Sequence, residues 1–268
     1  MSPAIDFFSV SEGNIRRARW QYRKLLRLVD VAVGARGALA RHRARKAARQ
    51  IPSQAVLLTA VEVPGREADL ARVIKKIVEK THHNLNVVVT TMAPVGKFDN
   101  INRAITGHDL TKYEWILVVD DDVEVPNDFL NLLLYFSWTH NLKIAQPAHK
   151  FDSYASFRIT RRHWVSQARR TGYVEIGPVC LLHRDTFTDL IPFPSLRWAW
   201  GLDIYWAHIA QRRGWRMGVI DAAPINHLRP VGGSYDNSAA ANGAIEFLAS
   251  HGVTLRKAEM FGVNDRIA

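Results

Sequence analysis

The chain has 268 residues, of which 47% are hydrophobic and 23% are charged, and its formal net charge is +11 at pH 7. This composition excludes disorder throughout, and the length fits one large α/β domain or such a domain with a helical extension. The single cysteine, Cys180, excludes an internal disulfide framework and a zinc site built from cysteines.

The positive charge is concentrated near the N-terminus. Residues 14–50 contain twelve Lys or Arg and one acid, Asp30, so this segment alone carries +11. Apolar spacing predicts a helix over residues 14–33, interrupted at Gly34 and Gly37, and a second basic helix over residues 38–49. We therefore divide the chain into a basic helical extension, residues 1–50, and a main domain, residues 51–268.

The basic extension has two interpretations that the sequence leaves open. Clustered cations are attracted to an anionic membrane surface, and they are equally typical of a helix packed on the body with a solvated basic face. No apolar stretch approaches the length that spans a bilayer, and the first residues lack a secretory signal pattern. We expect a cytoplasmic protein, with a peripheral position at the inner face of a membrane as an open option.

The main domain begins with a strand–helix–strand pattern over residues 55–61, 66–79 and 85–90, which predicts a right-handed βαβ unit. Residues 115–119 form an unbroken apolar run, typical of a strand buried on both faces. Further elements are predicted as a helix at 129–138, a strand at 144–148, a strand that includes Glu175, a helix at 204–213 and a strand at 217–220. The fold class is therefore α/β, with a mixed, mainly parallel central sheet flanked by helices.

Three carboxylates, Asp120, Asp121 and Asp122, follow the buried strand directly. Ligands gather beyond the carboxyl ends of such strands, and side-chain alternation places Asp120 and Asp122 on one side and Asp121 on the other. Two neighbouring carboxylates repel each other unless a cation lies between them, and Mg²⁺ or Mn²⁺ is the usual cation. The alternative is a solvated acidic turn.

Other segments carry polar groups suited to a ligand. Lys97 opens a predicted helix whose N-terminus would attract phosphates, with Asn100 and Asn102 as hydrogen-bonding groups; the alternative is a capped surface helix with Asp99 near its start. The arginine- and aromatic-rich residues 151–171 are interpreted as a phosphate-binding or sugar-stacking loop. Glu175 is interpreted either as a ligand for sugar or as the partner of a nearby arginine.

Two groups of residues carry a family resemblance. The acidic triplet, followed by Val125 and Pro126, resembles the Asp-x-Asp motif of GT-A-fold glycosyltransferases. The string Trp-Gly-Leu-Asp at residues 200–203, followed by a helix, Gly-Val-Ile-Asp at 218–221 and His227, looks like a plant and bacterial family described as a domain of unknown function. That family is assigned to the GT-A enzymes by similarity, and the match covers about residues 55–236.

The resemblance implies a metal-dependent glycosyltransferase that moves a sugar from a nucleotide-sugar donor, UDP-sugar before GDP-sugar, to a hydroxyl acceptor with inversion. Asp203 is the implied catalytic base, and Asp120, Asp122 and His227 are the implied ligands of Mn²⁺ or Mg²⁺. The implied nucleotide-binding residues are Thr59, Ala60, Val61, Glu62, Lys97, Asn100, Asn102, Asp121 and Arg229. The implied acceptor- or sugar-binding residues are Glu175, Trp198, Trp200, Gly201 and Leu202. Residues 228–235 are expected to form a mobile lid.

Two alternatives remain. A sugar-phosphate nucleotidyltransferase uses the same sheet and acidic pair, but residues 61–66 are a poor substitute for its glycine-rich loop. A non-catalytic basic protein that binds nucleic acid or lipid on a GT-A-like fold would depend on the N-terminal arm. Nucleic acid is disfavoured as a partner because no recognisable nucleic-acid motif is present. The acceptor class, whether glycan, lipid-linked sugar or small molecule, is open.

Overall fold

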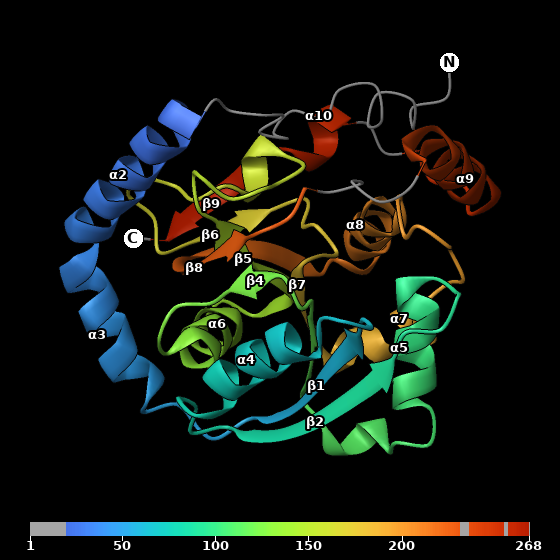
Figure 1. The fold of residues 1–268 in the computed structure, drawn as a ribbon, viewed down its shortest axis with the longest axis horizontal. Helices are drawn as coiled ribbons and strands as arrows, with labels where there is room; N and C mark the ends of the chain where they lie inside the picture. Colours follow the sequence, from blue (N-terminus) through green and yellow to red (C-terminus); the bar gives the residue numbers. More distant parts are fainter. Residues whose placement is uncertain (1–19, 231–235, 255–256, 268) are drawn as a thin grey trace.

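The computed structural model describes residues 20–230, 236–254 and 257–267. Its helices are α2 (Trp20–Arg36), α3 (Ala38–Ala48), α4 (Glu67–Val78), α5 (Lys97–Ile105), α6 (Phe129–Thr139), α7 (Phe187–Leu190), α8 (Leu202–Arg213), α9 (Asn237–Ser250) and α10 (Lys257–Met260). Its strands are β1 (Ala55–Glu62), β2 (Asn84–Thr91), β3 (Trp115–Val119), β4 (Val123–Glu124), β5 (Leu142–His149), β6 (Ala168–Thr171), β7 (Val179–His183), β8 (Arg216–His227) and β9 (Val263–Ile267). Figure 1 shows their arrangement.

The strands form one mixed sheet in the order β2-β1-β3-β7-β5-β8-β6-β9, with β4 paired to β8. The pairs β1–β2, β1–β3 and β5–β8 are parallel, and the remaining pairs are antiparallel. The predicted βαβ unit is present as β1, α4 and β2. The sheet is more antiparallel than the sequence indicated, because β7 runs between β3 and β5 in the opposite direction.

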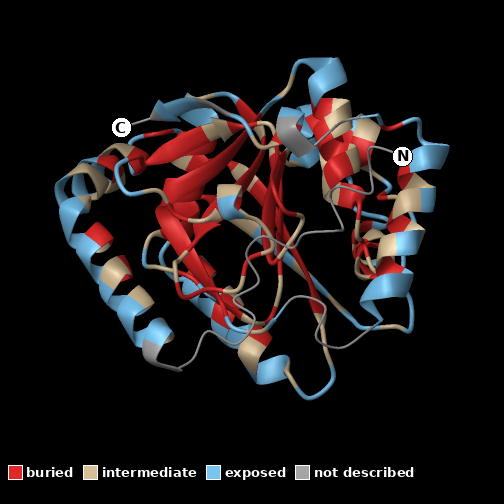
Figure 2. Cartoon of the chain, turned by 90° about the horizontal axis from the view of Figure 1, so that it is seen from above, coloured by how far each residue is buried: buried red, intermediate tan, exposed pale blue. Residues whose placement is uncertain are grey.

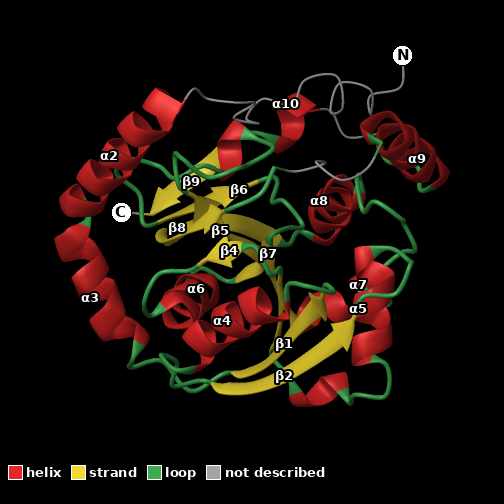
Figure 3. Ribbon diagram, in the orientation of Figure 1, coloured by secondary structure: helices red, strands yellow, loops and turns green. Residues whose placement is uncertain are grey.

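Helices cover both faces of the sheet and create two apolar cores (Figure 3). One core joins the sheet to α4, α6 and the end of α3, with Leu70, Leu133 and Ala48 among its buried members. The other joins the opposite face to α5 and α8, with Phe98 and Trp206 among its members. The central strands are almost wholly buried (Figure 2), and β3 is buried at every position. This burial explains why the run in β3 is apolar throughout.

Several element boundaries differ from the sequence-based prediction. Helix α2 continues through Gly34 to Arg36, and the break falls at Gly37, which precedes α3. Strand β8 extends seven residues beyond the predicted end, to His227. Residues 172–178 form no strand, so the prediction of a strand around Glu175 was wrong. The described helices include none that is long and apolar enough to cross a membrane.

Helices α2 and α3 lie along one edge of the body. Asp30 of α2 accepts a hydrogen bond from the amide of Phe151 at 2.8 Å, and Arg27 pairs with Asp152 at 2.7 Å. Arg45 of α3 and Arg49 after it lie 3.5 and 3.6 Å from the carboxylate of Asp128. The described part of the basic extension is therefore attached to the main domain at both ends. The domain division at residue 50 stays a prediction.

Candidate active site

The acidic triplet leaves the sheet where β3 ends, at the edge reached by the N-terminus of α5. The amide of Asp120 donates to the carbonyl of Pro178 at 2.9 Å, which fixes the backbone there. The ammonium of Lys97 lies 2.6 Å from Oδ1 of Asp120. Burial works to lower the pKa of Lys97, but the Asp120 carboxylate outweighs it and the pKa is raised. Lys97 therefore stays positively charged beside the acidic triplet.

Asp122 and His227 form the second polar pair. Strand β4 pairs with β8 so that Val123 lies opposite His227, and this register brings the imidazole beside the triplet. Nε2 of His227 is 3.3 Å from Oδ1 of Asp122. Burial disfavours the charged Asp122 carboxylate and the charged His227 imidazolium. The hydrogen bond and the attraction between the two groups outweigh burial, so the pKa of Asp122 is lowered and the pKa of His227 is raised. The imidazole of His227 reaches this position because β8 continues past residue 220, where the sequence predicted its end.

Asp121 has a different ion-pair partner from the other two carboxylates. It is 6% exposed, and its Oδ2 is 3.8 Å from a guanidinium nitrogen of Arg66. Burial raises the pKa of the Asp121 carboxyl, the charge of Asp122 adds to this, and Arg66 offsets part of it. Asp120 and Asp122 instead both act on Lys97 and His227. Asp121 and Asp122 lie in a turn after β3 ends at Val119, so the strand alternation expected for the triplet does not apply to them.

The site offers two adjacent ligands for a metal ion. Among the residues that the structure describes, no three His, Cys, Asp or Glu side chains are placed to hold a metal together. Asp122 and Nε2 of His227 are adjacent, and the other imidazole nitrogen, Nδ1, is buried without a hydrogen-bond partner in the described structure. A carboxylate–imidazole pair suits a divalent ion that takes its remaining ligands from substrate phosphates. Asp120, the third predicted ligand, is turned to Lys97.

Asp203 lies in the first turn of α8, and its Oδ1 accepts a hydrogen bond from the amide of Ile204 at 2.9 Å. The buried phenol of Tyr173 donates to Oδ2. Burial raises the pKa of Asp203 to about 6, although both hydrogen bonds work to lower it. A carboxylate with such a pKa is ionised near neutral pH and is more basic than an exposed aspartate, as a general base requires.

Glu175 interacts with two parts of the site, the Asp122–His227 pair and Asp203. It is 5% exposed, and it accepts hydrogen bonds from the hydroxyl of Thr160 and from the amides of Ser156 and Phe157 at 3.3 and 3.4 Å. Its charge acts on His227 and on Asp203. Burial raises the pKa of Glu175, and the three hydrogen bonds offset part of this. Glu175 therefore anchors the 156–160 loop between the acidic triplet and Asp203.

The predicted nucleotide-binding residues are not all brought to this edge. Thr59 and Ala60 lie in the centre of the sheet with no exposed surface, Val61 is 9% exposed, and Glu62 ends β1 with a partly exposed side chain. The Asn100 side chain bonds to backbone groups of residues 93–96, and Asn102 bonds to Phe193. Both asparagines hold loops together, and Asp99 caps the helix by accepting a hydrogen bond from the amide of Gly96 at 3.2 Å.

Arg229 lies close enough to the triplet for its charge to act on Asp121 and Asp122, and it is 3.5 Å from Asp69 of α4. It lies two residues after His227, at the same edge as the polar pair. The predicted lid begins here, but its residues 231–235 lie outside the described structure. Arg229 thus joins Lys97 and Arg66 as a cation near the acidic triplet.

The predicted sugar-binding residues surround the start of α8. Trp198 and Trp200 are partly buried, and the guanidinium of Arg197 lies 4.8 Å from the Trp198 ring centroid. Leu202 is buried in the core, and Gly201 is the residue that begins α8. The indole rings therefore provide partly exposed apolar surface five and three residues before Asp203.

Sequence reasoning missed three residues of the site. Tyr173 holds Asp203, Arg66 approaches Asp121, and the hydroxyl of Ser153 accepts a hydrogen bond from the amide of His227 at 2.8 Å. Tyr173 lies two residues before Glu175, but nothing local in the sequence indicates its contact with Asp203. Ser153 and Arg66 carried no signal, because their contacts join segments far apart in the chain.

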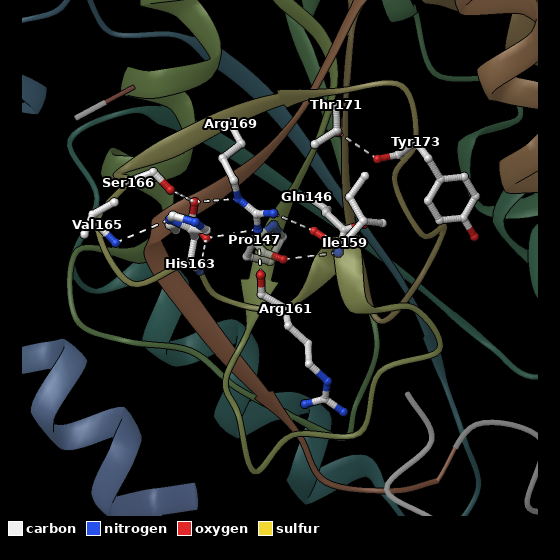
Figure 4. Close-up of polar contacts among 11 residues, drawn as sticks. Gln146, Pro147, Ile159, Arg161, His163, Val165, Ser166, Arg169, Thr171 and Tyr173 are labelled. Carbon is white, nitrogen blue, oxygen red and sulfur yellow. Dashed lines mark hydrogen bonds and ion pairs between the residues drawn. The ribbon is translucent and has the colours of Figure 1, made fainter. Parts of the chain in front are cut away.

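The arginine-rich segment 151–171 is largely engaged in internal contacts, contrary to its interpretation as a ligand-binding loop. Arg169 forms an ion pair with Asp221 at 2.8 Å and donates to the carbonyls of Ile159 and Arg161 (Figure 4). Arg161 in turn donates to three carbonyls of residues 150–153, and Arg162 donates to the carbonyl of Asp30. These guanidinium groups satisfy buried carbonyls that the irregular backbone leaves unpaired.

Gly201 is required by the backbone at the entry to α8. Its φ is +89°, and a Cβ there would lie 3.1 Å from Cβ of Ala244. We expect Gly201→Ala to lower the free energy of unfolding by about 1–2 kcal/mol, because an L-residue is strained at positive φ. Urea unfolding measures this loss. Gly243→Ala is the matched control, since nothing lies within 4 Å of the added methyl group; equal effects of the two changes would contradict the prediction.

Comparisons with known proteins give a fold but no sequence family. No family model matches the sequence, and no curated protein matches it. The structure of GalNAc-T7 with UDP, GalNAc and Mn²⁺ is similar, with a TM-score of 0.53 and 9% identity over 74% of this chain and 48% of that chain. The catalytic domain of Drosophila β1,4-galactosyltransferase 7 in complex with xylobiose gives a TM-score of 0.48 and 12% identity over 70% of this chain and 79% of that one.

The chain spans about half the length of GalNAc-T7. The likeness to GalNAc-T7 identifies a GT-A-type arrangement, so the predicted α/β fold class, a central mixed sheet flanked by helices, is confirmed. At 9% identity the comparison establishes fold alone, and function must be argued from the site.

Proposed function

We propose that the protein is a glycosyltransferase that uses a nucleotide-sugar donor, UDP-sugar before GDP-sugar, and a divalent metal ion. The observation that carries the proposal is the polar group at the carboxyl end of β3, where Asp122 pairs with His227 and Lys97 pairs with Asp120. Two cation-binding groups beside two cations suit a metal–diphosphate complex. A solved structure of the same fold contains UDP, GalNAc and Mn²⁺, and the Trp-Gly-Leu-Asp string supports the same assignment.

Each residue has a task in this proposal. Asp122 and His227 would hold the ion, which neutralises charge on the departing diphosphate. Lys97 and Arg229 bind the diphosphate oxygens directly, and Lys97 then exchanges Asp120 for a phosphate. Trp198 and Trp200 offer flat apolar faces to a sugar ring.

Asp203 removes the proton from the acceptor hydroxyl as that oxygen attacks the anomeric carbon, and Tyr173 fixes the orientation of the carboxylate. This assigns an inverting reaction with a single displacement. The proton remains on Asp203 until it passes to solvent after the product leaves. Glu175 keeps the 156–160 loop in place between the two halves of the site.

Thermal unfolding against nucleotides tests the donor class. We expect UDP with Mn²⁺ to raise the midpoint temperature, whereas UDP alone, Mn²⁺ alone and GDP with Mn²⁺ give smaller shifts. A ligand at 100 times its dissociation constant adds about 2.7 kcal/mol to the stability of the folded state. No shift with any pair of nucleotide and metal would contradict the proposed donor.

Asp122→Asn tests the metal site. We expect it to abolish the part of the UDP shift that depends on Mn²⁺, because a neutral amide is a poor ligand for a divalent ion. Asp109→Asn is the matched control, since Asp109 lies on an exposed turn and caps residues 110–112. A Mn²⁺-dependent shift of wild-type size in Asp122→Asn would exclude Asp122 as a ligand.

A further inference from the structure

The outer face of the N-terminal helices carries exposed apolar side chains. Tyr22, Leu25, Leu28 and Val31 of α2 are 58%, 56%, 66% and 69% exposed, and Leu39 of α3 is 62% exposed. The four residues of α2 recur at three-residue steps, and the helical repeat sets their mean direction opposite Asp30, which is held against the body. A helix packed on a protein normally turns its polar face to water, so this face needs a partner.

The charge on the same two helices has one sign. Asp30 is the sole acid in α2 and α3, and it is 9% exposed and bound to the amides of Phe151 and Asp152. Arg36 and Arg43 are exposed cations on the same two helices. The outer face of the described arm is therefore apolar and cationic, with no carboxylate.

The junction of α2 and α3 adds a basic cavity of about 290 Å³. Arg36, Arg41 and Arg162 line it, together with one acid, Asp221, and with Trp164 and Val165, which are 50% and 53% exposed. Burial lowers the pKa of Arg41, and the charges of Arg162 and Arg45 lower it further. An anion in the cavity would relieve this repulsion, and the exposed indole next to it suits a lipid–water interface.

We propose that the outer face of α2 and α3, with Trp164 and Val165 beside it, docks on an anionic lipid bilayer. The leucines enter the boundary between headgroups and acyl chains, and the arginines bind lipid phosphates. A second copy of the chain fits less well, because two wholly cationic faces repel each other. A nucleic acid would bind the arginines but leave the leucines in water.

The geometry gives the docked protein a fixed orientation. Figure 1 places α2 and α3 along one edge of the molecule, and Arg27, Asp30 and Arg162 attach them to the loop after β5. The same loop reaches the candidate site, because Ser153 accepts from the amide of His227. The bilayer would thus hold the catalytic sheet through a rigid connection. This inference does not depend on the proposed sugar transfer.

Sedimentation of the full chain with vesicles tests the proposal. We expect the protein to bind vesicles of phosphatidylcholine with phosphatidylglycerol, to bind phosphatidylcholine alone at least tenfold less, and to dissociate as salt is added. Leu25→Glu with Leu28→Glu should lower binding to the anionic vesicles at least tenfold. Arg36→Glu with Arg43→Glu should do the same through charge.

Two matched changes on α4 serve as controls. Val78→Glu alters an apolar side chain that is 42% exposed, and Lys76→Glu reverses an exposed cation; both should keep wild-type vesicle binding. Equal binding to neutral and anionic vesicles, no binding at all, or wild-type binding by the leucine variant would overturn the proposal. A concentration-dependent dimer that the leucine variant abolishes would assign the face to a second copy and overturn it as well.

Discussion

Asp203→Asn is expected to reduce sugar transfer by about 100- to 10,000-fold while the shift in unfolding temperature with UDP and Mn²⁺ stays at its wild-type value. The amide keeps the shape of the carboxylate and its contacts with Tyr173 and Ile204, but it accepts no proton. Steady-state rates and donor-dependent unfolding measure the two effects separately. Turnover close to wild type would exclude Asp203 as the base, and lost donor binding would show a positional role instead.

The wild-type rate should rise with pH through about 6, where Asp203 loses its proton. The same pKa has an opposite effect on stability. Burial raises the pKa of Asp203 from its ordinary 3.8 to about 6, so the folded state holds a proton more tightly than the unfolded state. The stability that this tighter proton binding contributes is fully present below pH 3.8 and is lost as pH rises through 6. The loss is about 3 kcal/mol for a pKa shift of about two units.

It follows that Asp203→Asn raises the unfolding temperature at pH 8 relative to wild type, and that this advantage shrinks toward pH 4. The variant would gain stability where it loses activity, which is the pattern of a residue kept for catalysis. Asp109→Asn should give no gain at pH 8, because hydrogen bonds from Thr111 lower the pKa of Asp109. A lower unfolding temperature for Asp203→Asn at pH 8 would contradict the assigned cause of the shift.

The parts of the fold that the sequence predicted well are those determined locally. Strand β3 matches its predicted bounds because an unbroken apolar run ends abruptly in three carboxylates. Helices α4, α6 and α8 were found within two residues of their observed bounds from apolar spacing. The acidic triplet was likewise recognisable, because the end of a buried strand is a known place for a site.

The parts that the sequence could not give depend on contacts between distant segments. Asn102 and Phe193 are 91 residues apart, and Arg169 and Asp221 are 52 apart, so nothing local distinguishes a loop-holding asparagine from one that binds a nucleotide. The same limit applies to the arm. Asp30 accepts a hydrogen bond from the amide of Phe151, 121 residues later, so this contact of the arm with the body could not be read from the arm's own sequence.

Glu175 shows the limit most clearly. A carboxylate among apolar residues indicates an unusual environment, but the sequence does not say which donors satisfy it. The structure supplies a hydroxyl from Thr160 and two amides from an irregular loop, and the charge of Glu175 also acts on Arg161. Irregular loops carry no periodic signal, so their hydrogen bonds cannot be read from spacing.

The largest loss of stability is expected from Arg169→Met. The side chains of Arg169 and Asp221 are 4% and 0% exposed, and removing the guanidinium leaves a buried carboxylate with only the amide of His163 and the hydroxyl of Ser166 as donors. Breaking a buried pair in this way costs about 3–5 kcal/mol. Urea unfolding of the variant and wild type at pH 7 measures the difference.

A double-mutant cycle separates the pair from the packing around it. Arg169→Met with Asp221→Asn should cost less than the sum of the two single changes, because the double variant leaves no uncompensated charge in the interior. Arg213→Met is the matched surface control, since Arg213 pairs with Asp189 while 58% exposed, and it should cost about 1 kcal/mol or less. If Arg169→Met costs no more than Arg213→Met, the network around Asp221 does not hold the 159–166 loop on β8.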